Sequence, residues 1–241
     1  MPALRQHTSG RKSHDTGTYN SDAHRLTLVT GIRESPEFVR DLGCCEDDWV
    51  ADVFVRAARL SDVPEITVIQ ERCWRSAPGM PVDAPPPASS ESVRAWERAV
   101  LAPPSPRHQV FVALDATEPV GLSAVAPTTD PDLDPTTASE LLVFAVDPKH
   151  RRHGHGSRLL TATMESLTTS GVITATVWVN AVDDQSRQFL VSAGWAADGA
   201  HRSLALDDES PVETQLRQVR MGTDLSNTDR ADSDLVVNPR G

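Results

Sequence analysis

The chain has 241 residues and a mass of 26.1 kDa, enough for one full domain with extensions or for two small domains. Its 34 acidic residues outnumber its 23 basic residues, and the net charge of −11 argues against general binding to nucleic acid or to an acidic membrane. Three cysteines without a CxxC spacing indicate neither a disulfide framework nor a zinc motif, and no apolar run has the roughly 18 residues of a membrane span. We expect a soluble, cytoplasmic protein.

Composition divides the chain into three regions. Residues 1–50 are polar and predict a largely disordered N-terminal extension. Residues 207–241 contain repeated aspartates and few apolar groups, which predicts an acidic, mostly disordered C-terminal tail. Residues 51–206 alternate strand and helix patterns and predict the folded domain.

The first part of this domain predicts one strand and two helices. Val53–Val55 is a short β-rich run, and the Ser61-Asp62-Val63-Pro64-Glu65 segment that follows has a capping residue, Pro and Glu where a helix begins. Residues 92–101 place apolar side chains at helical spacing. Proline-rich breaks surround this second helix.

The second part predicts mostly strands, separated by two helices. In chain order we expect a hairpin of strands 110–114 and 120–125, a buried strand 140–146, a helix 156–170, a strand 173–179, a helix 183–193 and weaker strands near 195 and 201–206. This order favours a mixed α/β sheet flanked by helices.

The segment from Val146 to Leu160 (VDPKHRRHGHGSRLL) carries the clearest chemistry. A buried strand ends, a basic turn follows, and Gly154 and Gly156 lie where a helix begins. The first N–H groups of a helix have no intrahelical partners, and its dipole makes this end positive. Glycines let the backbone approach a phosphate, and Arg151 and Arg152 add charged donors. The pattern therefore indicates a pyrophosphate site.

The spacing fits neither a Walker A loop nor a dinucleotide-binding fingerprint. As Arg-x-x-Gly-x-Gly after a strand ending in Val-x-Pro, it resembles the acetyl-CoA pyrophosphate loop of the GNAT superfamily of N-acetyltransferases. Asp183 to Trp195 resembles the downstream helix of that family, which ends in Gly and an aromatic residue. Residues 55–66 resemble its first strand and helix.

This resemblance implies a GNAT-like fold, an α/β (α+β) mixed sheet that is splayed at its centre. The pantetheine arm of acetyl-CoA would then lie beside the strand, paired with backbone groups of Phe144, Ala145 and Val146. The pyrophosphate would be held by the loop residues Arg151, Arg152, His153, Gly154, His155, Gly156 and Ser157. Asp183 stands where relatives often carry an asparagine that contacts the cofactor.

The family transfers the acetyl group directly from the thioester to an amine, so a proton must leave the amine and another must reach the thiolate. We favour Glu140, at the start of the central strand, as the general base; the alternative is a solvated glutamate at a strand end. Many relatives supply a tyrosine as general acid, but Leu190 holds the matching position here, and the chain's only tyrosine is Tyr19.

His150, His153 and His155 form an H-x-x-H-x-H pattern, which is also compatible with a metal site. In a glycine-containing anion loop we expect these side chains near phosphate or solvent, and we expect no metal.

The leading hypothesis is an acetyl-CoA-dependent N-acetyltransferase acting on a primary amine, which the acidic field would attract if it is cationic. A non-catalytic acyl-CoA-binding module on the same fold stays open because the tyrosine is missing. A third alternative is an interaction protein whose extensions do the binding. Many relatives form dimers, so the resemblance also leaves a homodimer open. Small amines, antibiotics, peptide N-termini and protein lysines all remain as acceptors.

Overall fold

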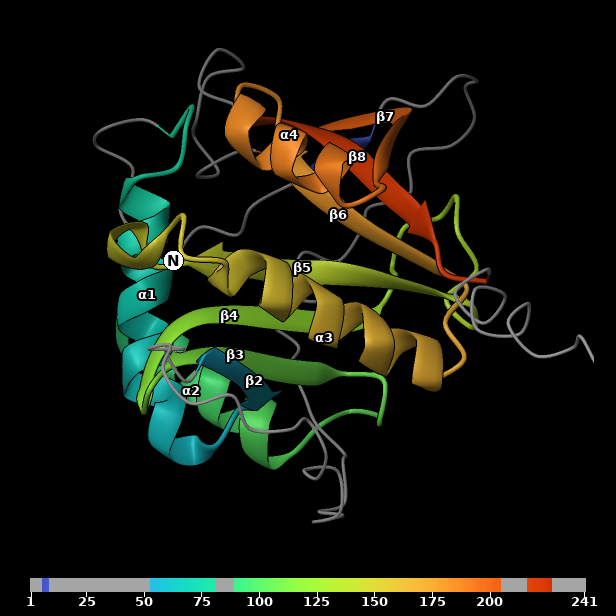
Figure 1. The fold of residues 1–241 in the computed structure, drawn as a ribbon. Helices are drawn as coiled ribbons and strands as arrows, with labels where there is room; N and C mark the ends of the chain where they lie inside the picture. Colours follow the sequence, from blue (N-terminus) through green and yellow to red (C-terminus); the bar gives the residue numbers. More distant parts are fainter. Residues whose placement is uncertain (1–5, 9–52, 81–88, 205–215, 227–241) are drawn as a thin grey trace, which may run out of the picture.

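The structure is a computed structural model that describes residues 6–8, 53–80, 89–204 and 216–226. These residues form one sheet of eight strands in the order β1-β7-β8-β6-β5-β4-β3-β2, with four α-helices (Figure 1). In chain order the elements are β1 (Gln6–Thr8), β2 (Val53–Ala57), η2 (Leu60–Asp62), α1 (Val63–Arg75), α2 (Ser89–Leu101), β3 (Gln109–Asp115), β4 (Glu118–Pro127), β5 (Ala138–Val146), η3 (Pro148–His150), α3 (His155–Thr169), β6 (Thr174–Asn180), α4 (Asp184–Ser192), β7 (Ala196–Leu204) and β8 (Leu216–Asp224).

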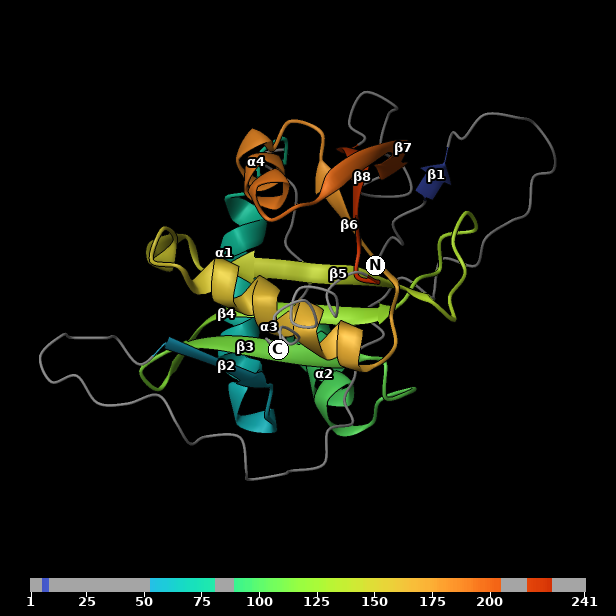
Figure 2. The same ribbon diagram turned by 45° about the vertical axis from the view of Figure 1, so that its right-hand side comes forward.

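Helices cover both faces of the sheet. Helix α3 crosses β3, β4 and β5 on one face, whereas α1 and α2 pack on the opposite face (Figures 1 and 2). Each face has its own core, because side chains alternate across a strand. Leu159 and Leu167 of α3 join Leu141 in one core, and Ile66 and Trp96 of α1 and α2 belong to the other.

The sheet opens at its centre, between β5 and β6. Strand β5 pairs antiparallel with β4 along Ser139 to Val146 but pairs parallel with β6 only from Ala138 to Leu141. Beyond Leu141 the two strands diverge, and both views show β6 turning away from the carboxyl end of β5 (Figures 1 and 2). The expected mixed, centrally splayed sheet is confirmed.

The predicted domain boundary at residue 206 is too early. Strand β8, at 216–224, lies inside the sheet between β6 and β7, so part of the expected acidic tail belongs to the fold. The three-residue strand β1 likewise pairs with β7 from inside the N-terminal extension. The rest of both extensions, with Tyr19, Cys44 and Cys45, lies outside the described residues.

Most of the predicted elements are confirmed. The predicted helix start leads into α1, with Pro64 in its first turn, and the predicted hairpin is β3 and β4 joined through Ala116 and Thr117. Helix α3 ends where predicted, with Gly171 following in a left-handed conformation at φ 76°. Among the described helices, none is both long and apolar enough to cross a membrane.

Candidate functional site

The carboxyl half of β5 has one unpaired edge. The N–H of Asp147 donates to the carbonyl of Val120 at 2.9 Å, and hydrogen-bonded pairs alternate along an antiparallel ladder. The backbone groups of Ala145 therefore point toward β4, whereas those of Phe144 and Val146 point toward the side where β6 has departed. Of the three strand residues predicted to pair with pantetheine, Phe144 and Val146 face the open edge and Ala145 faces away from it.

A β-bulge interrupts β5 just where the opening begins. Ala124 pairs with Val143 and Val125 pairs with Leu141, so Leu142 has no opposite residue on β4. A bulge leaves the extra residue out of the ladder and redirects the strand. Nothing in the apolar sequence of this strand signals the irregularity.

The turn after β5 is held by a buried carboxylate. Asp147 is buried, and its side chain accepts the N–H of Lys149 at 2.9 Å and an N–H of Arg72 at 2.5 Å. Burial alone would raise the pKa of Asp147, but these donors outweigh it and lower the pKa. The ion pair anchors η3 to α1, and Arg72 had no signal in the sequence.

Arg151 turns inward rather than toward the helix start. Its Nε donates to the carbonyl of Val146 at 3.1 Å, and its guanidinium lies 3.5 Å from Ser76 Oγ and 3.9 Å from Cys73 Sγ. The Cys73 thiol also donates to the Val146 carbonyl, at 3.4 Å. In the structure, Arg151 therefore braces the loop against β5 and α1. The neighbouring Arg152 is exposed.

Two left-handed residues shape the loop. Gly154 has φ 82°, where glycine carries no steric penalty, and Arg152 has φ 71°, which is uncommon for a residue with a Cβ. The first intrahelical bond of α3 runs from Arg158 N–H to Gly154 O at 3.2 Å. The N–H groups of His155, Gly156 and Ser157 thus precede the helix ladder, as the predicted anion site requires.

Aromatic side chains flank the open edge. Phe144 of β5 stacks on Phe189 of α4, with ring centroids 5.9 Å apart and an interplanar angle of 20°. An added Cβ on Gly156 would meet Phe189 at 3.6 Å and Val146 at 3.7 Å, which are ordinary contact distances. Helix α3, helix α4 and β5 therefore meet closely around Gly156.

At the start of α4, Asp183 acts as a helix cap. Its carboxylate accepts the N–H of Ser186 at 3.0 Å and the Ser186 hydroxyl at 2.7 Å. Leu190, at the position where relatives carry a tyrosine, is buried in the core beneath α4. Neither residue places an acidic proton at the open edge.

Glu140 is not a solvated strand-end residue, because only 4% of it is exposed. Leu141 belongs to the α3 core, so by strand alternation Glu140 projects from the opposite face. Burial raises the pKa of Glu140, with Asp130 adding to the rise and Arg202 and Arg220 opposing it. A raised pKa makes a carboxylate a stronger base.

The cations near Glu140 belong to a network around Trp178. Arg202 lies over the Trp178 ring, 4.4 Å from its centroid, and donates to Gln218 at 2.8 Å. Burial lowers the pKa of Arg202 to about 10, which leaves it charged at neutral pH. Arg220 donates to Asp130 and Asp198, each at 2.6 Å.

The three histidines of the loop occupy different environments. His153 is exposed, but His155 is only 2% exposed and its Nε2 lies 3.9 Å from the Asp115 carboxylate. Of the two positions expected for these side chains, near phosphate or near solvent, the His155 side chain does not take the second. His150 also approaches Asp115, at 3.5 Å.

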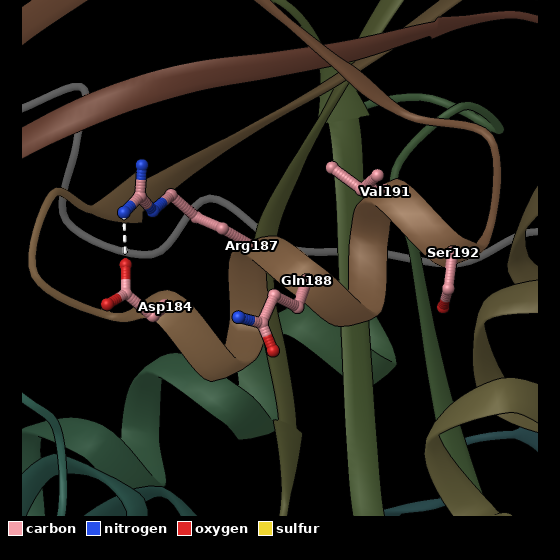
Figure 3. Close-up of a pocket in the computed structure, with 5 residues that line it drawn as sticks. All are labelled: Asp184, Arg187, Gln188, Val191 and Ser192. Carbon is pink, nitrogen blue, oxygen red and sulfur yellow. Dashed lines mark hydrogen bonds and ion pairs between the residues drawn. The ribbon is translucent and has the colours of Figure 1, made fainter.

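A depression of about 380 Å³ lies on α4 (Figure 3). Its lining residues are Asp184, Arg187, Gln188, Val191 and Ser192, with an ion pair between Asp184 and Arg187. None of the predicted site residues contributes to it, and we assign it no role. The predicted cofactor-binding residues lie instead mainly along the open edge of β5 and in the loop that follows.

Comparisons with known proteins agree with this arrangement. The model of the acetyltransferase (GNAT) family matches residues 64–195. An N-acetyltransferase from Staphylococcus aureus Mu50 superposes with a TM-score of 0.58 at 16% identity, over 73% of this chain and 99% of that one. The protein yncA from Salmonella typhimurium, solved with its cofactor acetyl-CoA, has a TM-score of 0.56 at 15% identity, over 78% and 98% of the two chains.

The ribosomal-protein-S18-alanine N-acetyltransferase from Escherichia coli has a TM-score of 0.52 at 17% identity, over 72% of this chain and 94% of that one. At these identities the structural likeness establishes the fold. A search of curated protein sequences gives no match.

Proposed function

The chain belongs to the GNAT acetyltransferase family, and on that premise we propose that it transfers the acetyl group of acetyl-CoA to a primary amine. The observation that carries this proposal is the unpaired edge of β5, which runs directly into the glycine loop and the N-terminus of α3. This edge is one continuous track of backbone donors and acceptors. Its chemistry suits a ligand that has amides at one end and phosphates at the other.

The cofactor would bind as an added strand. Amide groups of pantetheine can pair with the outward backbone groups of Phe144 and with the Val146 N–H, as a peptide pairs with a sheet edge, whereas the Val146 carbonyl already accepts from Arg151 and Cys73. The N–H groups of His155, Gly156 and Ser157 would hold the pyrophosphate, with Gly154 leaving room for close approach and Arg152 adding charge. Arg151 and Asp183 would support this site by bracing the loop and capping α4.

The reaction requires a neutral amine. Glu140, whose pKa is raised by burial, would take the proton of the ammonium directly or through a water. The amine nitrogen then attacks the thioester carbonyl, a strand N–H stabilises the oxyanion, and the C–S bond breaks to release the amide and the CoA thiolate. The acidic field of the chain would favour a cationic amine as acceptor.

Acetyl transfer needs a proton donor for the CoA thiolate, whereas binding of acyl-CoA without turnover does not. Leu190 is buried where relatives carry a tyrosine, and no described residue is a tyrosine, so water or the amine's own proton would serve. The same observation favours, as second candidate, a module that binds acyl-CoA without turning it over.

Calorimetric titration with acetyl-CoA, with acetyl-pantetheine as the matched probe, tests the site. Acetyl-CoA should bind and acetyl-pantetheine should bind far more weakly, because it lacks the pyrophosphate. Thiol release measured with a panel of amines then separates the two candidates. Binding without thiol release would favour the non-catalytic module, and the absence of acetyl-CoA binding would contradict both.

A further inference from the structure

Three side chains converge behind the glycine loop, on the side toward β3 and away from the open edge of β5. We call Asp115, His150 and His155 the loop triad. Asp115 ends β3, His150 ends η3 and His155 begins α3, so three separate segments supply one group each. The mechanism proposed above uses none of these three side chains.

The triad has the donor set of a metal site. Its ligand atoms all lie within 4.8 Å of one another. Asp115 Oδ2 is 3.5 Å from His150 Nδ1 and 3.9 Å from His155 Nε2. Ligand atoms about 2.1 Å from a tetrahedral zinc ion lie about 3.4 Å from one another. The two carboxylate–histidine distances are about 0.1 and 0.5 Å wider than this ideal, and the ligand atoms of the two histidines lie within 4.8 Å of each other.

Small side-chain movements would close the triad. The side chains of Asp115 and His150 are 39% and 31% exposed, so both can rotate toward a cation. His155 is fixed by burial, and its Nδ1 has no hydrogen-bond partner within the part of the chain that the structure describes. With Nε2 on the ion, Nδ1 is the nitrogen that takes an outer-shell partner, and a water can fill that position.

The electrostatics of the site allow a cation. The N-terminus of α3 opposes a positive charge, but the Asp115 carboxylate offsets it, because its Oδ2 atom approaches both His150 and His155.

We propose that the loop triad binds a divalent transition metal of the zinc class, with three protein ligands and a fourth position open to water. Two imidazoles and one carboxylate are ligands that zinc accepts in this arrangement. The ion would join the β3–β4 turn, η3 and the start of α3, and so hold the glycine loop from behind. This metal site is independent of the proposed acetyl transfer and can be tested without it.

Zinc titration of the full chain, stripped of metal with a chelator, tests this proposal. Calorimetry should show one ion bound per chain. Asp115→Asn and His150→Gln should each weaken binding by more than the roughly 10–100-fold that losing an outer-shell partner costs. His153→Gln is the matched control, because His153 is in the same loop but outside the triad, and this variant should bind as wild type does.

Two further measurements test whether the triad itself holds the ion. Zinc should raise the midpoint of thermal unfolding of the wild type and leave that of Asp115→Asn unchanged, while the metal-free proteins unfold alike. Cobalt should give a visible d–d band without a sulfur-to-metal band. The proposal is overturned if zinc does not bind, if Asp115→Asn binds it equally well, or if a sulfur band assigns the ion to cysteine.

Discussion

The two halves of β5 differ in sequence and in environment, because residues 138–141 include Ser139 and Glu140, whereas residues 142–146 are all apolar. From Ala138 to Leu141 the strand is paired on both sides and every residue is buried. From Val143 to Val146 it is paired with β4 alone, and every residue from Leu142 to Val146 is partly exposed. Burial in this strand therefore follows pairing on both edges and not apolar composition. The bulge at Leu142 marks the transition.

The open edge exists because β6 diverges from β5 after Leu141. The open half is wholly apolar and yet partly exposed, because the departure of β6 leaves backbone groups of Phe144 and Val146 without a strand partner. The site is completed by the loop and by α3, which follow the open half directly in the chain. Perturbing the open half should impair binding, whereas perturbing the closed half should impair folding.

The largest effect on acetyl-CoA binding is expected in the glycine loop, between the open half of β5 and α3. Gly154→Val places a β-branched residue at φ 82° and brings a Cβ to 2.8 Å from the Arg158 guanidinium. We expect acetyl-CoA affinity to fall by on the order of 100-fold, about 2.7 kcal/mol, because the backbone can no longer approach the pyrophosphate. Calorimetry measures this.

Gly156→Ala is the matched control for that change. Its Cβ would meet Phe189 and Val146 at ordinary contact distances and its φ is unstrained, so the affinity should change by less than about tenfold. Circular dichroism of both variants separates a loss of binding from a loss of fold. Wild-type affinity in Gly154→Val would contradict the assignment of the loop.

Glu140→Gln tests whether the closed half contributes chemistry. The amide keeps the shape of the side chain but cannot accept a proton, so turnover should fall by about 100-fold while acetyl-CoA affinity stays the same. Steady-state rates and calorimetry measure the two quantities separately. An unchanged rate at every pH would remove Glu140 as the base.

Much of the loop that follows the open half of β5 could be predicted from the sequence. The spacing of Gly154 and Gly156 after a buried strand is local information, because a helix start and a glycine turn depend on neighbours in the chain. This spacing led to the fold family and to the position of the loop. The cap that Asp183 forms on α4 is equally local, but from the sequence Asp183 was predicted only as a cofactor contact.

The rest depends on contacts between distant segments. Strand β8 was missed because its sequence is polar, and buried Arg220 is neutralised by Asp130 and Asp198 from two other segments. The burial of Glu140 and the inward turn of Arg151 likewise depend on residues far away in the chain. The left-handed Arg152 gave no signal, because nothing about a residue with a Cβ indicates a positive φ.

A pair of alanine substitutions should separate the two halves. Leu141→Ala removes a side chain that is buried in the α3 core and should lower the free energy of unfolding by about 2–5 kcal/mol. Phe144→Ala removes a partly exposed ring and should cost less stability, but it should weaken acetyl-CoA binding. Denaturant unfolding and calorimetry of both variants measure this. Equal effects on binding would contradict the division of β5.

The smallest effect is expected in the pH dependence of stability. Burial raises the pKa of Glu140 above its ordinary value, so the folded chain holds this proton at pH values where the unfolded chain has released it. The free energy of unfolding should therefore fall as the pH rises from the unfolded pKa through the raised folded pKa.

Glu140→Gln removes this titration. The variant should have a flatter stability profile across that window and should be more stable than wild type above it, where the wild type holds a buried carboxylate. Urea unfolding at a series of pH values measures the difference, and the curves should converge at acidic pH, where wild-type Glu140 is protonated. A variant less stable than wild type at neutral pH would mean that Arg202 and Arg220 stabilise the carboxylate by more than burial destabilises it. The closed half of β5 would then hold a structural ion cluster instead of a poised base.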